Sequence, residues 1–282
     1  MTNPTSVRRQ NLALIAGFGL LLALMYWPLL VWLAKASVQV TQLSTGALLV
    51  VFAGIVCLQD SLRDLRLDPQ IRPLGLGLLA LGFWCLWLAR FLAWGVLPMA
   101  VFSFCSSFAA IIAFLFGRAG VRQFLPALVG VFVFGLLVGL FPTLDWPLRT
   151  MAARYAAGLL NTLGAPVQLA VEPGQPAELV LGVGGRFFRV ATECNGFGLL
   201  TSALLLAAIL AFQYRLLWLN KIGLLAISIP AAIVCNFVRI VSICLVAPRV
   251  RLPYFFVHET LGVIFYFAGL ALVWRAARRA KR

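Results

Sequence analysis

Charged residues are scarce in this sequence. Only 11% of its 282 residues are Asp, Glu, Lys or Arg, whereas 63% are hydrophobic and the mean hydropathy is +1.01. A soluble globular domain has about one quarter charged residues and about half apolar residues. The composition therefore excludes a water-soluble fold and predicts an integral membrane protein.

Acidic residues are scarcer still, with 8 Asp and Glu against 23 Lys and Arg, which gives a formal net charge of +15. The cations lie in short runs between apolar stretches instead of on one continuous basic face. We therefore expect no nucleic-acid partner, and the expected anionic partner is the lipid surface. No carboxylate falls in the middle of a predicted span, which disfavours an aspartyl intramembrane protease and a proton-coupled transporter.

The motifs of several enzyme classes are also missing. The chain has one histidine, so His258-Glu259 cannot be extended to a zinc-binding HExxH motif. Its six cysteines form no CxxC pair, and we expect neither a metal nor another cofactor. No GxSxG elbow and no P-loop occurs. Five of the cysteines lie in apolar runs and are interpreted as small buried hydrophobes, which leaves Cys194.

Long apolar runs dominate what is present. A bilayer core of about 30 Å needs about 20 helical residues, and eight segments qualify. They are residues 12–34, 43–58, 74–89, 91–116, 124–141, 196–212, 222–247 and 259–274, the third and fourth being separated only by Arg90. The sequence therefore predicts an all-α polytopic membrane helix bundle of about eight transmembrane helices.

Lys and Arg set the expected orientation, because cytoplasmic loops retain positive charge. Both termini are basic, with Arg8 and Arg9 at one end and the tail 275–282 at the other. Placing both termini in the cytoplasm requires an even number of spans, which eight satisfies. We predict a multi-pass protein of the inner membrane.

The longest segment between spans, 142–193, is predicted to lie outside. It begins with an interfacial helix over 146–163 that ends at Gly164. Strands over 167–171, 178–183 and 186–192 follow, separated by the turn signals Pro173-Gly174 and Gly184-Gly185. This small extracytoplasmic β-hairpin precedes the sixth span. The predicted organisation is a five-span region 1–141, this external segment 142–193, a three-span catalytic core 194–274 and the basic tail.

Three reactive side chains fall at a similar depth in this topology. Cys194 opens the sixth span from outside, and His258 opens the eighth. Arg239 lies about 27 Å further along the seventh span than Lys221, at 1.5 Å per residue, which places it in the outer leaflet. We therefore expect Cys194, Arg239 and His258 to meet at the outer face.

Such a trio suits nucleophilic catalysis. A thiol at a helix N-terminus has a stabilised thiolate, so Cys194 is the candidate nucleophile. His258 can take the thiol proton and later return it to a leaving group. The backbone amides of Asn195 and Gly196 and the guanidinium of Arg239 can stabilise a tetrahedral oxyanion.

Each residue also has a structural interpretation. A cysteine at a helix start is more often a packing residue than a nucleophile, and a lone interfacial histidine is more often a polar tip. Arg239 differs, because a charge inside a span costs at least about 3 kcal/mol and so favours a functional or partner-bound role. Asn236, one turn earlier, is expected to orient Arg239 or to bond another helix. Glu193 and Glu259 are expected to be interfacial, since adjacent helical residues do not face each other.

Three short motifs occur in order in the C-terminal half. They are Cys194-Asn195-Gly196-Phe197 after a short β segment, Asn236-Phe237-Val238-Arg239 in the next-but-one apolar block, and His258-Glu259-Thr260-Leu261-Gly262 at the start of the last span. This combination, over residues 141–267, resembles the exosortase and archaeosortase family of membrane cysteine transpeptidases. The family often has Ser or Ala where this chain has Asn195.

The resemblance implies a substrate and a reaction. The substrate is a membrane-anchored protein whose C-terminal sorting signal has a motif such as Pro-Glu-Pro, a transmembrane helix and a basic tail. The enzyme cleaves near the motif through a thioester at the periplasmic face and transfers the new C-terminus to an acceptor, either a lipid or a polysaccharide. A carboxylate of the motif could meet basic side chains outside, which could equally anchor lipid headgroups. These are Arg149, Arg154, Arg186 and Arg189.

A function of another class stays open. The chain could be a non-enzymatic scaffold subunit or a transporter for polysaccharide export. Arg239 would then line a substrate path, and Cys194 would be a packing residue.

Overall fold

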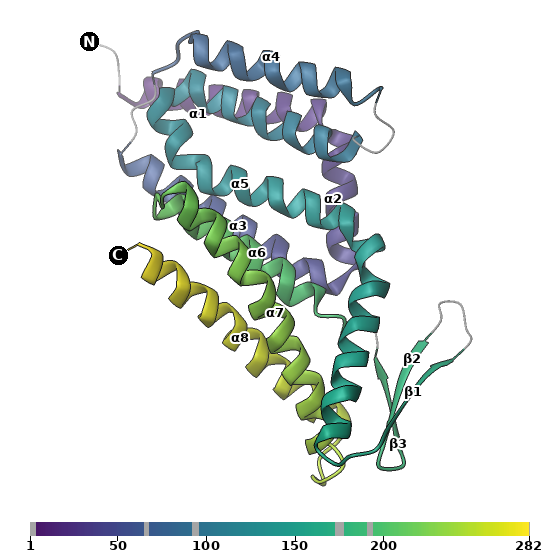
Figure 1. The fold of residues 1–282 in the computed structure, drawn as a ribbon. Helices are drawn as coiled ribbons and strands as arrows, with labels where there is room; N and C mark the ends of the chain where they lie inside the picture. The colour runs from purple at the N-terminus through teal and green to yellow at the C-terminus, as the bar shows by residue number, and fades with distance from the viewer. Residues whose placement is uncertain (1–3, 65–67, 92–95, 173–177, 191–193, 282) are drawn as a thin grey trace. The chain divides into compact units, whose positions relative to one another are not determined.

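The computed structural model describes residues 4–64, 68–91, 96–172, 178–190 and 194–281 (Figure 1). Their contacts divide the chain into unit 1, Met1–Val40 with Val50–Gly139, and unit 2, Thr41–Leu49 with Leu140–Arg282. The elements in chain order are α1 (Pro4–Met25), α2 (Trp27–Gln39), α3 (Thr41–Asp64), α4 (Pro73–Leu88), α5 (Val96–Thr162), β1 (Val167–Glu172), β2 (Glu178–Val183), β3 (Arg186–Val190), α6 (Phe197–Gln213), α7 (Trp218–Val246) and α8 (Tyr254–Ala280).

The first predicted span, 12–34, is not one straight helix. α1 and α2 are separated at Tyr26, and their axes differ by 79°. Pro28 explains the break, because it has no N–H for the carbonyl of Leu24 and its ring would collide with that carbonyl in a continuous helix. The prediction is corrected to a bent pair of helices, which is either one broken span or a re-entrant loop.

Hydroxyl groups connect the helices of unit 1. The hydroxyl of Tyr26 lies 2.6 Å from Ser103 Oγ and 2.9 Å from Ser107 Oγ, and Ser106 Oγ donates to the carbonyl of Leu78 at 2.7 Å. Bonds of this kind between helices satisfy polar groups that lipid cannot satisfy. Hydrogen bonds made by serine hydroxyls therefore help to fix how the helices of unit 1 pack.

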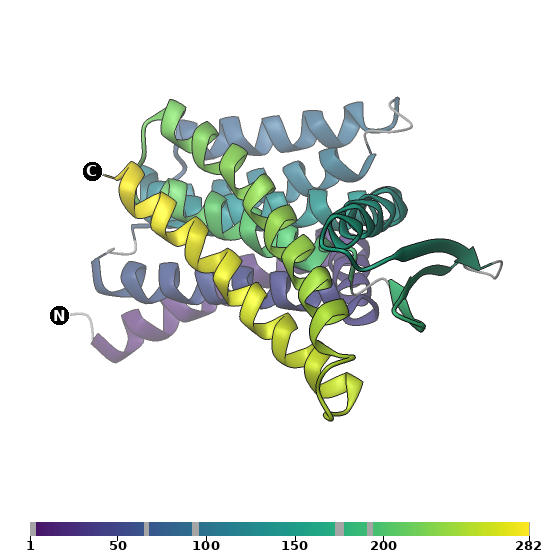
Figure 2. The same cartoon turned by 60° about the horizontal axis from the view of Figure 1, so that its bottom comes forward.

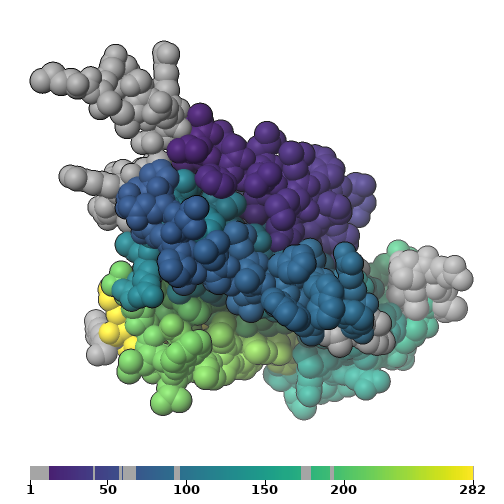
Figure 3. Space-filling view, turned by 90° about the horizontal axis from the view of Figure 1, so that it is seen from above, coloured from purple at the N-terminus to yellow at the C-terminus, as the bar shows by residue number. Residues whose placement is uncertain are grey.

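The outward face of α4 is apolar. Figure 3 shows this part of the chain in blue, spread over one face. A soluble protein rarely exposes an apolar surface of this extent, so α4 suits contact with lipid. Its exposed side chains include Leu76, Leu79, Leu81, Phe83, Trp84 and Trp87.

α5 covers two predicted spans and the predicted interfacial helix. Gly117, with φ 69° and ψ −161°, interrupts it where the sequence predicts a break after residue 116. The predicted end at residue 141 is wrong, because the helix continues through Pro142 and Pro147 to Thr162. Proline removes one backbone hydrogen bond and does not always stop a helix. The expected helix over 146–163 is thus the last part of α5, and Gly164 follows it with φ +79°.

The segment between α5 and α6 forms an antiparallel sheet in the order β1-β2-β3. Gly184 and Gly185, at φ 57° and 77°, make the two-residue turn between β2 and β3, where both positions need positive φ. The three strands lie where the sequence predicts them, and β1 extends the expected hairpin to three strands. The Pro173-Gly174 turn, the end of the third predicted strand and Glu193 lie outside the described residues.

The last three helices pack against one another in unit 2. α6, α7 and α8 make mutual contacts, and Figures 1 and 2 both show α7 and α8 side by side. A separate cluster joins the end of α5, the sheet, α7 and the start of α8. Cys194 lies in this cluster, at the entry to α6.

Three helices among the described residues are long and apolar enough to cross a bilayer, namely α5, α7 and α8. The bent pair adds a fourth if it is one span, and residues 42–56, α4 and α6 are apolar but shorter. The 67 residues of α5 correspond to about 100 Å of helix, more than one bilayer crossing. The chain is a helical multi-pass membrane protein with a small sheet, and eight spans stay a prediction.

Candidate active site

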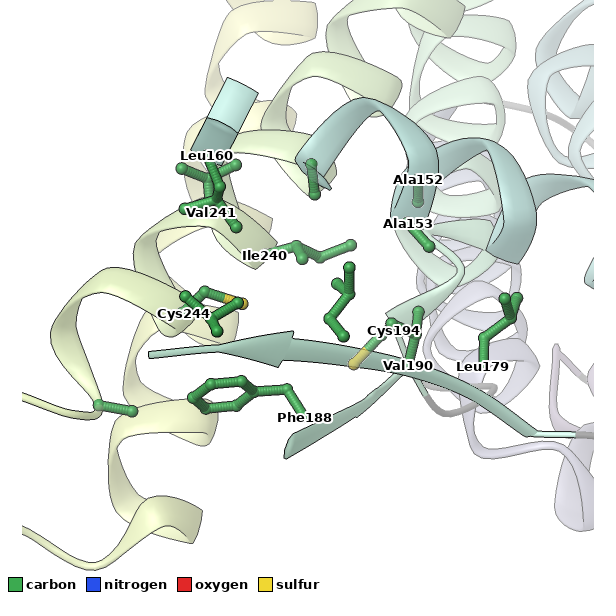
Figure 4. Packing of buried hydrophobic residues seen from close by; sticks show 14 of the residues in the cluster. Ala152, Ala153, Leu160, Leu179, Phe188, Val190, Cys194, Ile240, Val241 and Cys244 are labelled. Carbon is green, nitrogen blue, oxygen red and sulfur yellow. The ribbon is translucent and has the colours of Figure 1, made fainter. Parts of the chain in front are cut away.

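Cys194 lies in the short connection between the sheet and α6. Its side chain is 7% exposed and packs in an apolar cluster with Ala153 and Val190 (Figure 4). The turn at Gly196, with φ +79°, directs the chain from Cys194 into α6, which begins at Phe197. The thiol therefore lies directly before the turn that starts α6.

His258 lies beside the thiol. It belongs to the first turns of α8, its side chain is 15% exposed, and its Nε2 lies 3.4 Å from Cys194 Sγ. Its Nδ1 lies 3.4 Å from Glu259 Oε1. A proton on Nδ1, facing the carboxylate, leaves the lone pair on Nε2 and directed at the thiol. Helical spacing predicts that Glu259 points away from its neighbour, and the structure instead brings the two side chains within 3.4 Å.

Arg239 completes the trio from α7. Its Nη2 lies 3.4 Å from His258 Nε2, so the imidazole nitrogen faces both the thiol and the guanidinium. The guanidinium lies over Gly262, where an added Cβ would be 3.0 Å from Nη2 and 3.2 Å from Cζ. Gly262 is one turn after His258. α8 therefore places the imidazole and, one turn later, a residue without a side chain against which the Arg239 guanidinium packs. The spacing of the two residues in the sequence is the feature that could have identified Gly262.

Two cavities meet at His258. The thiol cavity has a volume of about 790 Å³, and the guanidinium cavity about 340 Å³. Both are lined by His258 and Glu259, so both lie next to the imidazole. Cys194, Arg186, Arg189, Phe188, Tyr254 and Leu252 are among the residues that line the thiol cavity. Gly196, Gly198, Asn236, Arg239, Gly262 and Tyr266 are among those of the guanidinium cavity.

A buried thiol, an imidazole and a guanidinium thus meet in a helical membrane protein. A family model described as transmembrane exosortase matches residues 41–275, which is most of the chain. The chain belongs to the transmembrane exosortase family. The match is longer than the region 141–267 whose motifs suggest the family. Comparison with curated proteins and with solved structures found no match.

Asn236 of this exosortase contacts the backbone of the candidate nucleophile. Its Nδ2 donates to the carbonyl of Cys194 at 3.0 Å, and its side chain is buried. The sequence predicts that Asn236 orients Arg239 or bonds another helix, and the structure gives its amide an acceptor in the turn before α6. This bond ties α7 to the residue that carries the thiol.

Two of the exosortase's four candidate substrate-binding arginines line the thiol cavity, and two do not. Arg186 and Arg189 line the thiol cavity. Arg154 is exposed on α5, whereas Arg149 is 6% exposed and pairs with Asp145. The burial of Arg149 disfavours a substrate-binding or headgroup role for it, because neither ligand could reach a guanidinium already enclosed. Asp145 was not predicted as a site residue, since Pro142 predicts an end to the helix that carries it.

Gly196 offers a sharp test of this turn. An alanine Cβ at 196 would lie 2.7 Å from Asn236 Nδ2 and 3.0 Å from Asn236 Cβ, so rotating the amide cannot relieve the clash. We expect Gly196→Ala to lower substrate processing by at least about 100-fold, because a displacement of about 1 Å at a catalytic group has this effect.

Gly164→Ala is the matched control for Gly196→Ala. Gly164 has the same φ of +79°, and a Cβ added there would have no atom within 4 Å. The substitution should therefore cost only the strain of a left-handed residue, about 1 kcal/mol in thermal unfolding, with processing retained. Equal loss of processing in both variants would show that strain, and not the contact with Asn236, decides the effect.

Proposed function

We propose that this exosortase is a cysteine transpeptidase that cleaves C-terminal sorting signals at the outer face of the inner membrane. The observation that carries the proposal is the meeting of Cys194, His258 and Arg239, with Nε2 lying 3.4 Å from both Sγ and Nη2. Members of the family process sorting signals, and this arrangement supplies a nucleophile, a base and a stabilising cation for that chemistry.

The reaction proceeds in two halves. His258 Nε2 takes the proton of the Cys194 thiol, and the thiolate attacks the scissile carbonyl carbon. The resulting oxyanion is stabilised by Arg239 and by backbone amides near Gly196. As the C–N bond breaks, His258 returns the proton to the leaving amine, and a thioester remains on Cys194. An acceptor nucleophile then attacks the thioester carbonyl and restores the thiol, with hydrolysis as the side reaction.

The thiol cavity is the proposed site for the sorting motif. Arg186 and Arg189 on β3 line it together with Cys194, and their positive charge suits a glutamate in a motif such as Pro-Glu-Pro. The transmembrane helix of the substrate would enter from lipid, and its basic tail would remain in the cytoplasm together with both termini of the enzyme. The proposed acceptor is a lipid or a polysaccharide.

Trapping the thioester tests the proposed function. A reporter substrate, consisting of a soluble protein followed by a Pro-Glu-Pro motif, a hydrophobic helix and a basic tail, is incubated with the enzyme in detergent. Mass spectrometry should find the truncated reporter on the Cys194 peptide, released by hydroxylamine as expected of a thioester. Cleavage without any adduct on Cys194, in a rapid-quench time course, would count against covalent catalysis. Absence of any cleavage would count against this substrate class.

Arg239→Lys probes the planar cation. A lysine keeps the charge but loses the fork of donors that rests on Gly262, so we expect reporter cleavage to fall about 100-fold to 1,000-fold. Arg249→Lys is the control, because Arg249 is exposed and donates to the carbonyl of Leu245 outside the trio. Full activity of Arg239→Lys would mean that charge alone is sufficient at this position.

A further inference from the structure

A carboxylate on α5 is connected to the turn that holds the thiol. Asp145 pairs through Oδ2 with Arg149 one turn later, at 2.5 Å. Through Oδ1 it accepts a hydrogen bond of 2.6 Å from Asn195 Nδ2. Arg149 is 6% exposed and Asn195 is 3% exposed, whereas the Asp145 side chain is 21% exposed, so both partners of the carboxylate are buried and the carboxylate is partly buried. In such an environment charge-assisted hydrogen bonds are strong and an unpaired member is costly.

The carboxylate decides how the amide of Asn195 is oriented. Nδ2 donates to Asp145, and Oδ1 accepts from the backbone N–H of Phe197 at 2.7 Å. The flipped amide would place its oxygen against the carboxylate and its NH2 group against another N–H, so both contacts would become repulsive. Asp145 therefore fixes the orientation in which Asn195 closes the first turn of α6.

The same turn is held from the opposite side by α7. Asn236 donates to the carbonyl of Cys194 and packs against Gly196. Three consecutive residues, Cys194 to Gly196, are thus clamped between a carboxylate network on α5 and an amide on α7. The direction in which Sγ points toward His258 follows from this clamp.

We propose that Asp145, acting through Asn195, is a positioning residue for the Cys194 thiol. The proposal rests on the proposed function, because it assumes that Cys194 is the nucleophile. Neither Asp145 nor Asn195 is among the described residues that line the thiol cavity. Changes to the pair should therefore lower kcat and the reactivity of the thiol while KM for the reporter is retained.

The test exchanges the carboxylate of Asp145 and the amide of Asn195, first one at a time and then together. Asn195→Asp alone sets two carboxylates against each other, and Asp145→Asn alone removes the carboxylate that pairs with Arg149. Each is expected to lower kcat about 10-fold to 100-fold. In the double variant the amide at 145 can donate to the carboxylate at 195, which can still accept from Phe197 N–H. One negative charge again faces Arg149 across the network, and we expect kcat to recover to within about threefold of wild type.

The rate at which iodoacetamide alkylates Cys194, followed on its peptide by mass spectrometry, gives a second readout that needs no substrate. It should fall in both single variants and recover in the double variant. All rates are divided by the amount of folded enzyme, measured by size-exclusion chromatography, so that a purely structural role would move the yield and leave these rates unchanged. Unchanged rates in the single variants, or a double variant no faster than the slower single one, would overturn the positioning role.

Two matched controls come from elsewhere in the chain. Asp68 pairs with Arg72 with the same i,i+4 spacing, and Asn161 Oδ1 accepts a backbone N–H from Val167 at 2.8 Å. Asp68→Asn and Asn161→Asp should leave kcat within about twofold of wild type, because both sites are exposed. A wild-type enzyme that forms no thioester, with alkylation still following the exchange pattern, would reject the proposed function and retain the positioning of the thiol.

Discussion

Replacing Cys194 with alanine or serine is expected to lower reporter cleavage by at least about 10⁴-fold. Alanine removes the nucleophile. Serine keeps the size, but its hydroxyl is a far weaker acid than a thiol, and an imidazole 3.4 Å away cannot generate enough alkoxide in a site built for sulfur. The measurement is the initial rate of reporter truncation per folded enzyme, and both variants should also lose the hydroxylamine-sensitive adduct.

Cys105→Ser is the matched control for this change. Cys105 lies in α5 within unit 1, and its Sγ contacts the carbonyl of Leu128. It should retain full cleavage, since it belongs to helix packing. The same variants distinguish the enzyme from the competing transporter or scaffold function. If polysaccharide export in cells is unaffected by both Cys194 variants but is lost with Arg239→Ala, the enzyme hypothesis fails and Arg239 is a path-lining residue.

Replacing His258 with alanine is expected to lower cleavage about 100-fold to 10,000-fold, the usual contribution of a general base. The loss should be partly recovered by free imidazole. The side chain lines two cavities of about 790 Å³ and about 340 Å³, and removing it leaves space for the small molecule next to Sγ. The measurement is the initial cleavage rate against imidazole concentration.

The controls for His258→Ala test whether the rescue by imidazole acts through the Cys194 thiol. His258 is the only histidine, so rescue by imidazole cannot reflect any other histidine in the chain. Cys194→Ala should not respond to imidazole, because no thiol remains to be deprotonated. The double variant lacking both groups should be no slower than Cys194→Ala, since residues that act as a unit are not additive. Cleavage by His258→Ala at the wild-type rate would remove His258 from the mechanism.

The three candidate residues could be selected from the sequence because each is unusual for its segment. A guanidinium inside the apolar stretch of α7 is costly in lipid. The chain has a single histidine, and Cys194 is its one cysteine outside an apolar run. Their shared depth followed from counting residues along helices. The strands were predictable for a similar local reason, since a two-residue turn between strands needs positive φ at both positions and Gly184 and Gly185 adopt it without strain.

The supporting contacts were not predictable in this way. Asp145 reaches Asn195 only because α5 continues through Pro142. Tertiary packing offsets the hydrogen bond that the proline removes, and a local sequence pattern does not report that packing. Helical spacing places Asn236 near Arg239, yet its amide bonds the Cys194 carbonyl on another element. The break at Tyr26 was not predicted, although Pro28 lies close to it in the sequence, and neither was the 79° angle between α1 and α2.

By itself the sequence determined that this is a membrane protein, where its strands lie, and which three side chains are candidates for the chemistry. Hydropathy, turn residues and the cost of burying charge are local properties, so the order of residues is enough to express them. Only the tertiary structure decided that Sγ, Nε2 and Nη2 meet, that Arg149 is buried on Asp145, and that the turn carrying Cys194 is held by hydrogen bonds from α5 and α7. Those contacts join residues far apart in the chain, and their distances depend on how helices pack.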